Sequence, residues 1–290
     1  MLTQQGDLKT NPAISVVNSS SVRVLRAESS ESERREYVLL APVGSEIPSD
    51  LGRVTAGQTS HSKLLGDVQR LRGRIYSEDG AIDPKTLSAD GRHQQAVDNQ
   101  SWHIVALGAD GTVQGCIRYS PHAKNVRFEH LGAAASALSQ SGNHHVREAI
   151  ENEIASAREK QVGFAEVGGW AIAPALRSST AALDMLLIAF ALIEKLGGSL
   201  GVSTATVRHG SASILQRMGL RPLEFQGNEL PAYYDPQYQC EMQILRFDSS
   251  APNPKYSNRL RNFQAQLSNI RVLCASNVNS VLPMTFAMAA

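Results

Sequence analysis

Residues 171–182 read AIAPALRSSTAA, and this stretch decides the fold. A strand-like run from Phe164 to Ile172 precedes Pro174, and an apolar, helix-like run begins at Ala181. The first backbone N–H groups of a helix have no partners within the helix, so such a start can hold an anion such as a pyrophosphate. Arg177 adds a fixed positive charge to the turn. On these residues alone, an ordinary capped turn and an anion site both stay open.

The segments on both sides of this turn alternate between strand and helix patterns. Downstream, we expect a helix over 181–196, a strand over 200–206, a helix over 211–218, and strands over 223–225 and 242–247. Upstream, we expect a strand over 36–44, a helix around 64–75, a hairpin with strands over 102–107 and 113–119, and a helix over 146–160. This order predicts an α/β fold in which a mixed central sheet is flanked by helices.

The chain divides into three predicted parts. Residues 1–35 are rich in Ser, Asn, Gln and Glu, which predicts a flexible N-terminal arm. Residues 36–250 carry the alternating pattern and form the predicted folded domain. Residues 251–290 are predicted to form a C-terminal helix and tail.

Composition narrows the functional classes. A net charge of +1 indicates no broad basic surface, so we expect no nucleic-acid partner. The three cysteines are widely separated and lack metal-ligand spacing, so we expect no metal site. The longest apolar run, Ala181–Ile193, contains Asp184 and is shorter than the roughly 20 residues that cross a bilayer. We therefore expect no integral membrane segment and a cytoplasmic location.

The turn at 171–182 resembles the acyl-CoA signature of the GNAT superfamily of N-acetyltransferases. In that signature, a strand and a proline precede Arg or Gln, two residues, Gly, one residue, and Gly or Ala. Arg177 matches the first position and Ala182 the last, whereas Thr180 replaces the usual glycine. That glycine lets the backbone approach the phosphates closely. The departure leaves open the choice between coenzyme A and another thioester carrier.

A second segment, HGSASILQRMGL at 209–220, resembles the next helix of that superfamily. Ala212 and Gly219 match it, and His209 stands where the superfamily has Asn. Leu215 replaces the tyrosine that often returns a proton to the leaving thiolate. The proton donor must therefore come from elsewhere in the chain or from water.

Three further segments are similar to long-chain N-acyl amino acid synthases and acyl-homoserine lactone synthases within the superfamily. They are RLRGRIY at 70–76, GCIRY at 115–119 and FAEVGGW at 164–170. The resemblance covers about residues 61–247 and implies a GNAT-like acyl-CoA N-acyltransferase fold. It also implies an acyl donor on an acyl carrier protein or coenzyme A, and an amino-acid-like amine as acceptor.

The resemblance and the anion-binding turn together give an expected donor site. Backbone N–H groups near Ile172 and Ala173 would hold the pantetheine and the developing oxyanion. The remaining residues of the predicted donor site are Arg177, Ser178, Ser179, Thr180, Ala181 and Ala182.

Three side chains are the candidate catalytic residues. Glu166 lies in an otherwise apolar strand and would take a proton from the amine, or else form a salt bridge or face solvent at an edge position. Arg118 would bind the acceptor carboxylate, or else pair with Glu166 or another acid. Tyr234 would supply the proton donor or, with Tyr233 and Tyr238 of the same loop, line an acyl or acceptor pocket, or else pack on the surface.

The sequence therefore predicts an N-acyltransferase. It would move an acyl group, long-chain by its resemblance, from an acyl carrier protein or coenzyme A thioester to the amine of an amino acid or similar small molecule. No permanently bound cofactor is expected, since the thioester is a co-substrate. An acyl carrier protein is the expected partner if the donor is carrier-bound. An acetyl-CoA-dependent N-acetyltransferase and a non-catalytic acyl-thioester-binding module are the alternatives.

Overall fold

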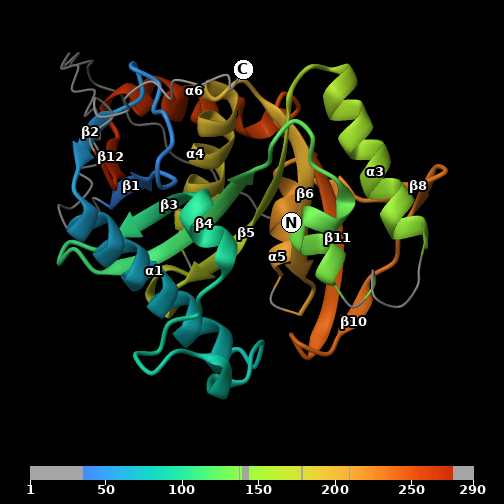
Figure 1. Cartoon of the computed structure of the whole chain (residues 1–290), viewed down its shortest axis with the longest axis horizontal. Coiled ribbons are helices and arrows are strands. Elements are labelled where there is room, and N and C mark those ends of the chain that lie inside the picture. The colour runs from blue at the N-terminus through green and yellow to red at the C-terminus, as the bar shows by residue number, and fades with distance from the viewer. Residues whose placement is uncertain (1–34, 137, 139–143, 178, 209, 277–290) are drawn as a thin grey trace, which may run out of the picture. The chain divides into compact units, whose positions relative to one another are not determined.

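The computed structural model describes residues 35–276 except 137, 139–143, 178 and 209. Within these residues, a ten-stranded mixed sheet carries helices on both faces (Figure 1). This arrangement confirms the predicted α/β class.

Nine of the ten strands lie side by side in one continuous order, and the first and the last of them are edge strands. In spatial order they are β10 (Tyr233–Asp235), β11 (Cys240–Asp248), β6 (Ser199–Thr206), β5 (Gly163–Ile172), β4 (Val113–Pro121), β3 (Trp102–Leu107), β1 (Glu36–Leu40), β12 (Arg271–Cys274) and β2 (Arg53–Ala56). A short tenth strand, β7 (Arg221–Pro222), pairs with β11. The β5–β6, β1–β12 and β12–β2 pairs are parallel, and the other pairs are antiparallel.

The helices follow the predicted order. They are α1 (Gln58–Glu78), α3 (His144–Glu159), α4 (Ala181–Lys195), α5 (Ser211–Arg217) and α6 (Ser257–Gln266). Several features differ from the sequence-based expectation. Strands β2 and β7 were not expected, and β10 lies in the tyrosine-rich segment expected to be a loop. The strand expected at 223–225 is β8 (Glu224–Phe225), which pairs with β9 (Asn228–Glu229) in a separate small hairpin. From the C-terminal region expected to be helix and tail, β12 enters the main sheet between β1 and β2.

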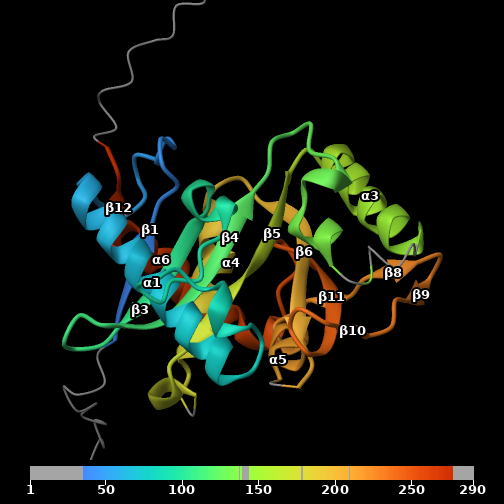
Figure 2. The same cartoon turned by 60° about the horizontal axis from the view of Figure 1, so that its bottom comes forward.

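The two faces of the sheet bury different helices, because side chains alternate along each strand. Ile104 and Ile117 pack in one cluster with α4 and α6, whereas the neighbouring Val105 and Cys116 pack in another with α1 (Figure 2). A third cluster joins α3 to the α1 side of β5, β6 and β11. Helix α4 is buried nearly all round, as its apolar sequence predicts. Each fully buried leucine or isoleucine contributes about 1.5–3 kcal/mol.

The parallel strands β5 and β6 separate near the middle of the sheet. Residues Gly163–Glu166 of β5 pair with residues Ser199–Val202 of β6, and the pairing stops there, although β5 continues to Ile172 and β6 to Thr206. A change of register between β4 and β5 accompanies the separation, and Gly169 there has a φ of +60°, which favours glycine. The fold therefore opens a gap between two adjacent strands of its own sheet.

Candidate functional site

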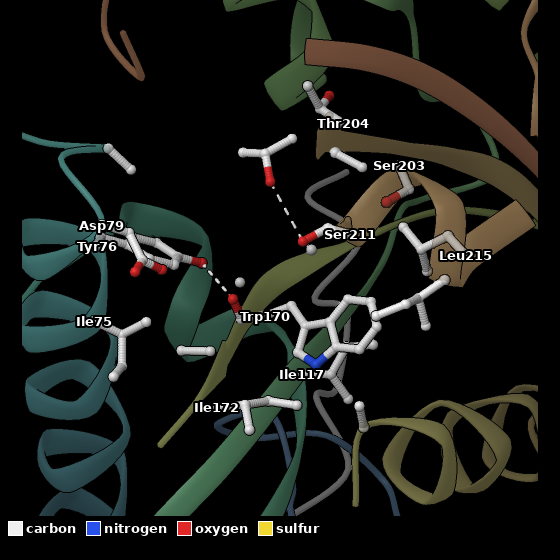
Figure 3. Close-up of a pocket in the computed structure, with 18 of the residues that line it drawn as sticks. Ile75, Tyr76, Asp79, Ile117, Trp170, Ile172, Ser203, Thr204, Ser211 and Leu215 are labelled. Carbon is white, nitrogen blue, oxygen red and sulfur yellow. Dashed lines mark hydrogen bonds between the residues drawn. The ribbon is translucent and has the colours of Figure 1, made fainter. Parts of the chain in front are cut away.

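A cavity of about 340 Å³ occupies the gap between β5 and β6 (Figure 3). Its walls include residues 167–172 of β5 and 203–206 of β6. Ile117 and Leu215, from the α4 side of the sheet, line it together with Ile75 and Tyr76 of α1, which packs on the opposite face. The cavity therefore reaches both faces, so two reactants could meet in it from opposite sides of the sheet.

Two arginines meet beside one part of the cavity wall. The Arg177 guanidinium lies 3.1 Å from the carboxylate of Asp79, and both residues line the cavity. Arg208 donates a hydrogen bond of 2.7 Å to the backbone carbonyl of Asp79. Arg177 comes from the turn after β5, Asp79 from the end of α1, and Arg208 from the segment after β6. The separation of the strands thus brings positive charge to a site where an anionic donor could enter.

The predicted donor turn lies partly on this cavity. Ile172, Arg177 and Ala182 line it. The N–H of Ala173 instead donates to the carbonyl of Gln114 at 2.8 Å, so it is not free to hold an oxyanion. Ser178 lies outside the described residues.

The hydroxyls of the turn serve the turn itself. Ser179 Oγ accepts a hydrogen bond of 3.2 Å from the N–H of Ala181 and donates one to the carbonyl of Leu176. Thr180 precedes the first residue of α4, and its hydroxyl donates to Asp184 at 3.0 Å. These hydrogen bonds stay within the turn and the start of α4, as expected if Ser179, Thr180 and Ala181 form an ordinary strand-to-helix turn rather than an anion site.

Glu166 is held by three donors and does not line the cavity. Its carboxylate accepts hydrogen bonds of 2.9 Å from the N–H groups of Gly132 and Ala133, and His122 Nε2 lies 3.0 Å away. Burial raises the pKa of Glu166, but the bonds from His122, Gly132 and Ala133 lower it more, and the net shift is downward. These contacts favour a role in fixing the loop at 132–133 over the expected role as a general base.

Arg118 belongs to a buried cluster with Arg72 and Asp98. Asp98 Oδ1 accepts from Arg118 Nη1 and Arg72 Nη1, each at 2.8 Å, and Arg118 Nη1 also lies 2.5 Å from Gln95 Oε1. The side chains of Arg72 and Asp98 are 0% and 1% exposed. Burial opposes ionisation of Asp98, but the hydrogen bonds and charge of Arg72 and the charge of Arg118 hold its pKa well below the usual range. Two cations and one anion leave an excess of one positive charge.

A glycine separates this cluster from the cavity. A Cβ atom placed on Gly169 would lie 3.1 Å from Arg72 Nη1 and 3.2 Å from Arg118 Cβ, and Gly169 lines the cavity. A Cβ on the neighbouring Gly168 would meet no atom within 4 Å. Arg118 Nε is buried and has no hydrogen-bond partner among the described residues. The positive charge beside this wall thus suits an anionic group of a ligand.

Two tyrosines line the cavity: Tyr238, from the tyrosine-rich loop that the sequence singles out, and Tyr76, which was not among the predicted site residues. Tyr76 donates a hydrogen bond of 3.2 Å to the carbonyl of Trp170 (Figure 3), and Tyr238 lines the wall nearby. Burial raises the pKa of both phenols, so they stay protonated at neutral pH. Tyr234, the predicted proton donor, is 61% exposed and is not part of the lining. Tyr76 lies four residues after Arg72 and therefore shares a helix face with it. This spacing is the sequence signal that could have indicated Tyr76 as a site residue.

Comparison with known proteins establishes the fold. No family model matches the sequence, and no curated protein matches it. Two solved structures of BjaI, a CoA-dependent acyl-homoserine lactone synthase, are 14% identical to this chain and cover 84% of it and 95% of their own chains. The one with SAM and isopentyl-CoA has a TM-score of 0.51, and the one with MTA has 0.50. The structure of FeeM, an N-acyl amino acid synthase from uncultured soil microbes, has a TM-score of 0.45 at 11% identity, covering 75% of this chain and 91% of its own.

The predicted GNAT-like acyltransferase fold is therefore confirmed. In the part of the chain that the structure describes, no helix has the length and apolar character needed to cross a membrane.

Proposed function

We propose that this protein is an N-acyltransferase that moves an acyl group from a pantetheine thioester to the amine of a small molecule. The observation that carries the proposal is the gap between β5 and β6, whose cavity reaches both faces of the sheet. A thioester that enters this gap presents its carbonyl where the sheet is open. Beyond Glu166, the edge of β5 that faces β6 is not paired with that strand, so its backbone groups can bond the pantetheine and the thioester carbonyl.

The acceptor side of the proposal rests on the buried cluster. Because the cluster carries an excess positive charge next to Gly169, the acceptor would be an amine that also bears a carboxylate. Arg118 lies behind Gly169 and does not line the cavity, so it would attract that carboxylate by its charge, and Arg72 and Asp98 would hold Arg118 in place. This arrangement supports an amino acid or a close relative as the acceptor.

The proton transfers would use few side chains. The attacking amine loses its proton to water, because Glu166 is occupied by three donors away from the cavity lining. Tyr238 would return a proton to the leaving thiolate, since its phenol stays protonated and lines the cavity. Leu215, which replaces the tyrosine of the GNAT pattern, lines the same cavity and leaves that role open.

Product analysis by mass spectrometry tests the proposal. Purified protein would be mixed with acetyl and palmitoyl thioesters, each on coenzyme A and on an acyl carrier protein, together with amino acids and their decarboxylated amines. We expect an N-acylated amino acid and little product from the decarboxylated amines. An acetylated product would assign the protein to acetyl-CoA chemistry. Thioester binding without any product would favour a non-catalytic module, and neither binding nor product would refute the proposal.

Two variants locate the reaction in the cavity. Gly168→Phe adds a ring to a cavity-lining position with open space around it, so we expect loss of transfer with an unchanged melting temperature. Arg118→Gln removes the excess positive charge beside Gly169, so kcat/KM for the carboxylated acceptor should fall by roughly 10- to 100-fold. An equal loss for the decarboxylated amine would show that Arg118 does not recognise the carboxylate.

A further inference from the structure

The cavity has an apolar chamber on the α4 side of the sheet. The apolar part of its lining comes from β4, β5, β6 and α5. The hydroxyl residues Ser203 and Ser211 also line the cavity there. The apolar residues are Ile117, Trp170, Ile172, Ala205, Ile214 and Leu215. Most of these side chains belong to the core cluster that packs beneath α4, or pack against it. A hydrocarbon chain would be buried in this chamber without leaving any polar group of its own unpaired.

Trp170 projects from β5 into the middle of this chamber (Figure 3). Its backbone is held in place, because its carbonyl accepts the hydrogen bond from Tyr76 on the opposite face of the sheet. Its side chain packs against the α4 cluster. The indole is thus a large, fixed obstacle in the part of the cavity that suits an acyl chain.

The polar atom of the indole has no role that the structure shows. Trp170 Nε1 is buried and has no hydrogen-bond partner among the described residues. An unsatisfied buried donor is unfavourable and calls for an explanation. The nitrogen is also shielded from the cavity space, so a ligand could not reach it in this arrangement. What the indole offers to a ligand is therefore its volume.

We propose that Trp170 is the residue that limits how long an acyl chain the protein accepts. This inference rests on the proposed function and adds a specificity-determining residue to it. An acyl chain that enters from the gap between β5 and β6 meets the indole before it can extend beneath α4. Removing the indole lengthens the chamber, and longer chains then gain burial.

The test is a chain-length profile measured with C4, C8, C12 and C16 acyl-CoA thioesters. Wild type, Trp170→Ala, Trp170→Phe and Ile75→Ala would be compared by kcat/KM for transfer and by Kd from titration calorimetry. Ile75 lines the cavity from α1, so Ile75→Ala enlarges the opposite side and serves as the matched control. Trp170→Leu replaces Trp170→Ala if the latter does not fold.

We expect Trp170→Ala to prefer longer chains than wild type, with a gain of roughly fourfold for each additional methylene that enters. Trp170→Phe, which lacks the N–H but keeps most of the volume, should keep the wild-type optimum, and so should Ile75→Ala. The inference is overturned if Trp170→Ala keeps the wild-type optimum, or if either of the other two variants shifts it equally. If no thioester is transferred by wild type, the proposed function fails, and the dependence of Kd on chain length still decides the role of Trp170.

Discussion

Replacing Asp98 with asparagine removes the anion that holds two buried guanidinium groups. Asp98 accepts hydrogen bonds from both Nη atoms of Arg72, from Arg118, from the amide of Gln69 and from the N–H of Gln95. Asparagine has nearly the same shape, but it offers one acceptor oxygen and turns an NH₂ group toward the remaining donors. Arg72 is fully buried, so its charge would have no counter-ion and no water.

The expected loss of stability is large. Breaking a buried ion pair by removing one partner costs about 3–5 kcal/mol. Because the Asp98 side chain is only 1% exposed, solvent does not screen the interaction. For a domain of this size, that loss lowers the melting temperature by about 10 °C. A total stability of about 5–15 kcal/mol means that the variant still folds at low temperature.

Thermal unfolding followed by circular dichroism measures this loss, and Asp90→Asn is the matched control. Asp90 pairs with Arg70 and Arg92, but its side chain is 43% exposed, so the same substitution should leave the midpoint close to that of wild type. A midpoint for Asp98→Asn as high as that of Asp90→Asn would refute the reasoning, because the buried cluster would then not depend on its anion.

Three further predictions concern nearby groups. Gly169→Ala should destabilise the protein by about 1–3 kcal/mol, because a left-handed φ of +60° disfavours other residues and the added carbon meets two arginines. Gly168→Ala should be nearly neutral, since a Cβ there meets no atom within 4 Å. Equal urea midpoints for the two variants would contradict this prediction. Glu166→Gln should lower the free energy of unfolding by about 1–3 kcal/mol at pH 7. Because the pKa of Glu166 is lowered in the fold, the difference between the variant and wild type should vanish as the pH falls through that pKa. A difference that persists at low pH would exclude the charge of Glu166 as its cause. Burial lowers the pKa of both His93 and His103 from 6.5 to about 4. Between these values the unfolded chain binds more protons than the folded chain, so the free energy of unfolding should decrease as the pH is lowered. The expected slope is about 1.4 kcal/mol per pH unit for each histidine. Urea titrations from pH 7 to 5 measure that slope, which His103→Gln should roughly halve and which would be absent if the two rings were protonated in the fold.

The sequence predicted the elements whose signals are local. The hairpin at 102–107 and 113–119, the helix α4 and the strands β5 and β6 lie close to their predicted bounds, because alternation, helical spacing and turn residues act over a few residues. Strand β12 was not predicted, because it is a four-residue segment that joins β1 and β2 from the far end of the chain. The register that places Val272 beside Leu39 leaves no trace in either segment alone.

The candidate site shows the same limit. The apolar strand around Glu166 marks it as a candidate, but two of its three partners are the backbone N–H groups of Gly132 and Ala133, which leave no side-chain signal, and the third, His122, lies 44 residues away in the sequence. Asp98 lies in a short 3₁₀ helix, Ala96–Gln100, and carries no pattern that ties it to Arg72. Tyr238 reaches the cavity from the turn between β10 and β11, whose position depends on strand pairing. Residue chemistry identified candidates, and the fold decided which of them meet.

The location of the thioester is the central claim, and a crystal structure with a bound donor analogue tests it most directly. The analogue would be an acyl-pantetheine thioether, which cannot be cleaved. We predict density for its pantetheine arm between residues 167–172 of β5 and 203–206 of β6, with the acyl chain ending at Trp170. Density for the analogue at another surface, with the gap between β5 and β6 unchanged and empty, would contradict the account.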